Sequence, residues 1–147
     1  MNSKTILLVE DNPSDRDLTK RALIRGHISN DLIVAEDGQE ALDYLRGEGA
    51  YAGRNVAETP AVVLLDLNLP KVSGLEVLRQ IRADPRLRRV PVVILTSSRE
   101  EEDVGAGYDL GVNSYVRKPV DFKEFQIAIE NLGLYWLILN EPNPPVR

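Results

Sequence analysis

The residue best placed to do chemistry in this chain is Asp66, a carboxylate that follows an apolar run. Residues 62–65 are all apolar, and two of them are β-branched, which predicts a strand buried on both faces. Pro70 comes soon afterwards and stops the chain from pairing further. In open α/β sheets, ligands bind at the carboxyl ends of the strands. We therefore expect Asp66 to be the reactive group of the protein.

Other polar residues stand in the same position, at or just after the end of an apolar run. They are Glu10, Asp11, Thr96 and Lys118. Taken singly, each has a plain structural explanation; the acidic pair, for example, could simply favour the positive N-terminus of the following helix. Those explanations do not account for all of them meeting at one edge, which is where the carboxyl ends of parallel strands lie.

This combination of residue types suits phosphoryl transfer. Three carboxylates at one place repel each other unless a cation lies between them. Carboxylate and carbonyl oxygens with water are the ligands that Mg²⁺ prefers. A lysine and a hydroxyl beside them could bind the oxygens of a phosphoryl group. The pattern predicts attack of a carboxylate on phosphorus, with the metal and the lysine neutralising the charge of the transition state.

The elements that must position these residues are five strands alternating with five helices. The expected strands are the apolar runs at residues 5–9, 32–35, 62–65, 92–95 and 112–116. Helices are expected after residues 12, 37 and 73, at residues 100–109, and from residue 121 onward. The alternation predicts an α/β fold, a doubly wound five-stranded parallel sheet. Residues 47–59 form a loop longer than most connections of this kind.

Composition restricts the classes of function. A chain of 147 residues suits one domain, and a net charge of −5 argues against direct binding of nucleic acid. The chain has no cysteine and a single histidine, His27, so disulfides, thiolate chemistry and a histidine-rich metal site are excluded. The first apolar run is too short for a signal peptide or a membrane span. We expect a cytoplasmic protein without a membrane partner.

Taken in order, these motifs resemble the receiver domain of response regulators, the phosphoacceptor half of two-component signalling. The resemblance runs from about residue 5 to residue 132. It rests on the acidic pair at residues 10–11, Leu-Asp-Leu-Asn-Leu-Pro at 65–70, Gly74, Leu-Thr at 95–96 and Tyr-Val-Arg-Lys-Pro at 115–119. Each motif alone is weak, but five in order after the right strands are specific. The fold of this family is the flavodoxin-like βα repeat, in agreement with the alternation above.

The resemblance implies a role for each acidic residue. Asp66 would accept a phosphoryl group from a sensor histidine kinase. Asp11 and Asp66 would bind Mg²⁺ (or Mn²⁺) directly, Glu10 mainly through water, and the backbone carbonyl of Asn68 would be a further ligand. The first acidic position is Glu10, where the family more often has aspartate, a variation that the family tolerates.

The resemblance also implies a switch and limits the chemistry. Lys118 would bind the phosphoryl oxygens, and the peptide bond before Pro119 would be cis. The Thr96 hydroxyl would turn inward on phosphorylation, and Tyr115 would follow it between exposed and buried rotamers. Members of this family are signalling domains that catalyse only their own phosphorylation and dephosphorylation, so we do not expect an enzyme.

The last expected helix carries a second apolar stripe. At 100° per residue, Ile127, Leu134 and Ile138 fall roughly opposite the stripe that should cover the sheet, which indicates a partner surface. We expect a receiver domain at residues 1–132 and a C-terminal extension at 133–147, with no output domain. The simplest partner is a second copy, and the resemblance implies that it binds through the fourth helix, fifth strand and fifth helix, together with the extension. Alternatively, Gly133 breaks the helix and residues 134–139 fold back on the chain.

The long loop and the apolar extension are similar to those of single-domain response regulators that serve cyanobacterial and bacterial phytochromes. Two other functions remain open at this point. One is a constitutive dimeric adaptor that phosphorylation does not control. The other is a Mg²⁺-dependent phosphohydrolase with Asp66 as nucleophile, although the haloacid-dehalogenase-like phosphatases have a second aspartate where this chain has Asn68.

Overall fold

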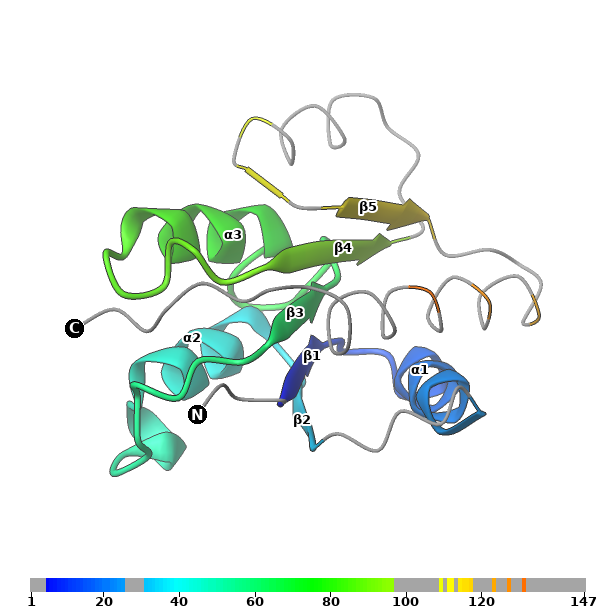
Figure 1. Ribbon diagram of the computed structural model, residues 1–147, viewed down its shortest axis with the longest axis horizontal. Helices are drawn as coiled ribbons and strands as arrows, with labels where there is room; N and C mark the ends of the chain where they lie inside the picture. The colour runs from blue at the N-terminus through cyan, green and yellow to red at the C-terminus, as the bar shows by residue number, and fades with distance from the viewer. Residues whose placement is uncertain are drawn as a thin grey trace.

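One parallel sheet of five strands forms the centre of the protein (Figure 1). The structure is a computed structural model that describes residues 5–25, 31–96, 109, 111–112, 114–117, 123, 127 and 131, with the backbone alone at residues 25, 96 and 114–117. The strands are β1 (Ile6–Val9), β2 (Leu32–Ala35), β3 (Val62–Leu65), β4 (Val92–Thr96) and β5 (Ser114–Arg117). Their order in space is β2-β1-β3-β4-β5, and every neighbouring pair is parallel. The predicted five-stranded parallel sheet is confirmed.

Helices cover both faces of this sheet, as a doubly wound fold requires. Helix α1 (Pro13–Arg25) lies on one face, while α2 (Gly38–Arg46) and α3 (Gly74–Ala83) lie on the other (Figure 1). Among the residues that the structure describes, no helix is long and apolar enough to cross a bilayer.

The central strands are buried on both faces because their residues alternate between two hydrophobic cores. Leu7 and Val9 of β1 belong to the core beneath α2 and α3. Ile6 and Leu8 belong to the core that includes Ala22 of α1. Strands β1 and β3 are buried at every position, so their continuous apolar sequences identify them as the middle of the sheet.

The helices begin and end where their sequences place capping residues. Asn12, Asp37 and Ser73 precede α1, α2 and α3, and their side chains accept backbone N–H groups of the first turn at 2.9, 2.7 and 3.2 Å respectively. Gly47 follows α2 in the left-handed conformation, with φ of 67°. Each cap lies at the boundary that the sequence predicts, so local chemistry alone defines these helix ends.

The fifth strand differs from its prediction. The apolar run predicts residues 112–116, but the strand begins at Ser114. Gly111 has a φ of 77°, and the Arg82 guanidinium donates to its carbonyl oxygen at 3.1 and 2.8 Å, which holds a turn there. Val112 is buried in the core before strand pairing starts. The Val112 side chain therefore packs in the core, although the residue lies outside the paired strand.

The long connection after α2 is folded back onto that helix. It contains a short 3₁₀ helix, η1 (Gly49–Tyr51). The Tyr51 ring meets the Tyr44 ring edge-on, with centroids 5.2 Å apart. The Arg54 guanidinium lies 4.1 Å from the centroid of the Tyr44 ring and donates to the carbonyl oxygens of Tyr44 at 2.7 Å and Leu45 at 3.4 Å. Arg54 thus adds hydrogen bonds to carbonyls at the end of α2, beside the Gly47 N–H on Tyr44 and the Arg86 guanidinium on Leu45.

We expect Arg54→Ala to lower the free energy of unfolding by about 1–3 kcal/mol, because the variant loses charge-assisted hydrogen bonds and a cation–π contact. Urea unfolding followed by circular dichroism measures the change. The control is Arg89→Ala, which removes an exposed arginine and should change stability by less than about 0.5 kcal/mol. Equal stability of the two variants would contradict the role given to Arg54.

Candidate functional site

The pairing of β1 with β3 brings two acidic residues side by side. Val9 is in register with Leu65, so Glu10 and Asp66 are the next residues of the two strands. The Asp66 N–H donates to the Val9 carbonyl at 3.1 Å, and the Glu10 N–H donates to the Ala35 carbonyl at 3.0 Å. The backbone ladder therefore continues one residue beyond each strand and fixes both carboxylates at the carboxyl edge.

Asp11 completes a cluster of three carboxylates. Oxygen atoms of Glu10, Asp11 and Asp66 all lie within 4.8 Å of one another. Glu10 and Asp66 are only 2% and 8% exposed, whereas Asp11 is exposed to solvent. Two unit charges at that distance repel by about 3 kcal/mol at an effective dielectric constant near 20. The predicted convergence of these three residues is confirmed.

The donor set fits a hard divalent cation such as Mg²⁺ or Mn²⁺. Every side-chain donor in the cluster is a carboxylate oxygen, and the exposed Asp11 leaves the site open to solvent. Asn68 lies beside the cluster and donates its backbone N–H to Asp66 Oδ1 at 3.3 Å. That hydrogen bond orients the Asp66 carboxylate; the role of the Asn68 carbonyl as a metal ligand stays a prediction.

Two glycines allow the loop after β3 to fold against the helices. A Cβ on Gly74, the first residue of α3, would lie 2.1 Å from the Asp66 carbonyl oxygen and 2.6 Å from the Leu67 Cα. A Cβ on Gly38, the first residue of α2, would lie 2.0 Å from the Val72 carbonyl oxygen. Only glycine permits approaches this close. Gly74 was part of the sequence motif, but the role of Gly38 was missed.

The other predicted site residues are described only in part. Thr96 is the last residue of β4, and Tyr115 lies within β5; the structure gives their backbones alone. Ile127 is helical and 51% exposed, and its role in an interface stays a prediction. Lys118, Pro119, Leu134 and Ile138 lie outside the described residues, as do the fourth helix apart from Asp109 and the predicted cis peptide bond.

Arg16 is a part of the site that the sequence did not reveal. From α1 its Nη1 donates to the carbonyl oxygens of Glu10 at 3.2 Å and Asp11 at 3.3 Å. The same atom lies 3.5 Å from Glu36 Oε1. Glu36 could have been noticed, because it directly follows β2 and so stands at the same edge as the other acidic residues.

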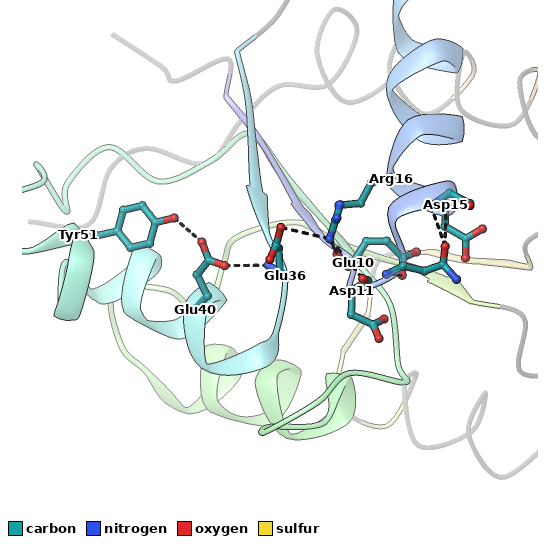
Figure 2. A network of polar contacts seen from close by, with 9 residues as sticks. Glu10, Asp11, Asp15, Arg16, Glu36, Glu40 and Tyr51 are labelled. Atoms are coloured by element: carbon teal, nitrogen blue, oxygen red, sulfur yellow. Dashed lines mark hydrogen bonds and ion pairs between the residues drawn. The ribbon is translucent and has the colours of Figure 1, made fainter.

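Glu36 is the first residue of a chain of polar contacts that ends at Tyr51 in η1 (Figure 2). The Glu36 N–H donates to Glu40 Oε1 at 2.9 Å, and the Tyr51 hydroxyl donates to Glu40 Oε2 at 2.6 Å. This hydrogen bond to Glu40, followed by burial, raises the pKa of Tyr51 to about 12. The chain links the folded connection after α2 to the backbone that carries Glu10 and Asp11.

Replacing Gly74 by alanine should destabilise the protein by about 3 kcal/mol, because the new Cβ must displace the backbone of the β3–α3 loop. Urea unfolding measures the loss. Ser73→Ala is the control: it removes only the cap of α3 and should cost about 1 kcal/mol. If the two substitutions cost the same, the close approach at Gly74 does not limit the loop.

Tyr51 should ionise later than the other tyrosines. The ultraviolet absorbance of wild type and of Tyr51→Phe is titrated with pH, and the difference between them reports Tyr51 alone. We expect this difference to show a pKa of about 12, above the usual tyrosine pKa of 10.0. Glu40→Gln should bring that pKa back toward the usual value. Since the folded state favours the protonated hydroxyl, the associated stability is present below pH 10 and is lost between pH 10 and 12. A missing tyrosine that ionises near pH 10 would contradict the Glu40 contact.

Known proteins are similar to this chain over nearly its whole length. A model of the response regulator receiver domain matches residues 6–130. The response regulator Rcp1 of Synechocystis sp. is 41% identical over 134 residues, which cover 91% of this chain and 89% of that protein. The crystal structure of Rcp1 in its Mn²⁺-bound form is similar with a TM-score of 0.86, at 39% identity and covering 96% of this chain and 99% of that one.

Two solved phytochrome response regulators are similar as well. Phosphorylated RcpA, a cyanobacterial protein, is 39% identical with a TM-score of 0.88, and the match covers 97% of this chain and 99% of that one. The bacteriophytochrome response regulator RtBRR is 57% identical with a TM-score of 0.78, and the match covers 97% of this chain and 85% of that one. With the strand-end acidic cluster at its expected place, the chain belongs to the response regulator receiver domain family.

Proposed function

We propose that Asp66 is the phosphoacceptor of this receiver domain and that phosphorylation controls its contacts with other proteins. The observation that carries the proposal is the position of Asp66 in the acidic cluster. Its carboxylate is held by the β1–β3 ladder and by the Asn68 N–H, within 4.8 Å of the Glu10 and Asp11 carboxylates. A nucleophile held in this way needs little reorganisation before it attacks.

The proposed reaction moves one phosphoryl group from a phosphohistidine to Asp66. An oxygen of the Asp66 carboxylate forms the new P–O bond while the P–N bond to the imidazole breaks. The imidazole nitrogen leaves with the electron pair of that bond and takes up a proton. Hydrolysis of the acyl phosphate later restores the carboxylate, so the domain's chemistry is confined to its own phosphorylation and dephosphorylation.

A bound Mg²⁺ or Mn²⁺ would neutralise the charge that gathers on the phosphoryl oxygens. Asp11 and Asp66 would hold this cation directly, Glu10 through water, and the carbonyl of Asn68 would add a ligand. Lys118, which follows the last residue of β5 in the sequence, would bind the phosphoryl oxygens. Thr96 and Tyr115, on the adjacent strands β4 and β5, would relay the phosphorylated state to the face formed by the fourth helix, β5 and the fifth helix.

The kinase that we propose is a sensor histidine kinase of the phytochrome class, acting in the cytoplasm where ATP is available. Support comes from the similarity to RcpA and RtBRR, whose names describe phytochrome and bacteriophytochrome response regulators. These relatives match over nearly all of this chain. The acidic cluster is common to receiver domains in general. The similarity to RcpA and RtBRR extends beyond it to 97% of this chain.

The proposed output is a homodimer. It would form through the face made of the fourth helix, β5 and the fifth helix, together with the C-terminal extension. Ile127 supports this part of the proposal, because a large apolar side chain that is 51% exposed gains from burial against a second copy. The division into a receiver at residues 1–132 and an extension at 133–147 stays a prediction, as do the interface roles of Leu134 and Ile138.

The test combines intact mass with sedimentation velocity, using acetyl phosphate and Mg²⁺ as the small-molecule donor system. We expect wild type to gain one phosphoryl group and to change its oligomeric state. Asp66→Asn should show neither change, because an amide is a poor nucleophile. Asp17→Asn, which alters an exposed carboxylate on α1, is the matched control and should behave as wild type.

Three results would contradict parts of this proposal. Phosphorylation of Asp66→Asn would place the acceptor elsewhere. Failure of wild type to take up a phosphoryl group, with assembly present throughout, would favour a constitutive adaptor. Sustained release of inorganic phosphate from added phosphomonoesters at many turnovers per chain would favour the phosphohydrolase.

A further inference from the structure

Arg16, on α1, contacts the backbone of Glu10 and Asp11 through its side chain. Its Nη1 joins three oxygens: the carbonyl oxygens of Glu10 at 3.2 Å and Asp11 at 3.3 Å, and Glu36 Oε1 at 3.5 Å. The Arg16 side chain is only 17% exposed, so a long cationic side chain is largely covered where it could have extended into solvent. Figure 2 shows Arg16 between Glu36 and the acidic pair.

The segment that Arg16 contacts is short and carries two of the three carboxylates. It leaves β1 after Val9 and enters α1 at Pro13. Asn12 caps α1 with its side chain, and its backbone N–H lies 3.4 Å from Glu10 Oε2. Arg16 binds the two carbonyls between these fixed ends. Their orientation determines where the Glu10 and Asp11 side chains leave the backbone, so the contact orients both carboxylates.

Glu36 and Glu40 hold Arg16 in turn. Glu36 accepts the guanidinium through its side chain and donates its own backbone N–H to Glu40 Oε1 at 2.9 Å. Glu40 is held at its other oxygen by the Tyr51 hydroxyl at 2.6 Å. The guanidinium therefore has contacts on two sides: the backbone carbonyls of Glu10 and Asp11, and the Glu36 carboxylate, which belongs to a residue whose backbone N–H is held by Glu40.

We propose that Arg16 is a positioning residue for the acidic cluster: it holds the Glu10–Asp11 backbone in the arrangement that binds a divalent cation. Outer residues that orient metal ligands commonly change metal affinity by 10- to 100-fold. The inference rests on the proposed function for its physiological meaning. It concerns the binding of Mg²⁺ to the unphosphorylated protein, which can be measured whether or not Asp66 is phosphorylated.

Charge and positioning predict opposite effects for this residue. Removing Arg16 deletes a positive charge near three carboxylates, which by Coulomb's law alone tightens the binding of a cation. Removing its hydrogen bonds releases the backbone of two ligands, which weakens binding. The sign of the change therefore distinguishes a positioning role from a purely electrostatic one.

The experiment is calorimetric titration of the unphosphorylated protein with MgCl₂. For Arg16→Ala we expect the dissociation constant to rise about tenfold. For Arg16→Lys, which keeps the charge but loses the planar guanidinium, we expect a rise of at least about threefold. The double variant Arg16→Ala/Glu36→Ala leaves the net charge unchanged and should still bind about tenfold more weakly. Arg21→Ala, an exposed arginine of the same helix, is the control and should bind as wild type does.

Kinetics provide a second measurement. With acetyl phosphate as donor, Arg16→Ala should need about tenfold more Mg²⁺ for half-maximal phosphorylation, yet reach the wild-type rate at saturating Mg²⁺. Unchanged or tighter Mg²⁺ binding in Arg16→Ala and in the double variant would overturn the proposal. If Arg16→Ala does not fold, the same comparison between Arg16→Lys and wild type decides the question. Failure of the proposed function looks different: wild type would bind Mg²⁺ and take up no phosphoryl group.

Discussion

The register between β1 and β3 is the constraint on which the site depends. Because Val9 is paired with Leu65, the two chains leave the sheet together and place Glu10 beside Asp66. Electrostatics oppose this placement, since the carboxylates repel one another. The opposing force is the burial of all four positions of β1 and all four of β3 in two hydrophobic cores. Apolar packing thus holds together charges that would otherwise separate, and an incoming cation finds its ligands already assembled.

A second set of contacts fixes the loop that follows β3 against the helices. The loop after β3 touches the first residues of both α2 and α3, where Gly38 and Gly74 leave no room for a side chain. Lys71 in that loop has a φ of 66° and forms an ion pair with Asp37 at 3.4 Å. The α2 N-terminus therefore contacts the loop that follows Asp66. Through Glu40 and Glu36 the same helix also supports Arg16 on the opposite side of the sheet.

Sequence patterns predicted the features that depend on neighbours along the chain. Apolar runs identified the strands, capping residues identified the ends of α2 and α3, and position after a strand identified Glu10, Asp11 and Asp66. Arg16 could not be found in this way, because the reach of a long side chain across a helix start depends on tertiary packing. The start of β5 was misplaced for a related reason: Val112 is apolar because it is buried, and a turn held by Arg82 delays pairing. The contacts of Thr96 and Lys118 stay predictions.

The central position of β1 has a consequence for synthesis on the ribosome. Strand β1 is made first, but both of its neighbours in the sheet, β2 and β3, come later in the chain. Neither hydrophobic core can close until Leu65 has emerged, since β3 supplies residues to both. Pairing over so long a separation forms late. We therefore expect the nascent chain to remain without its central sheet until Asp66, the residue directly after β3, is about to be translated.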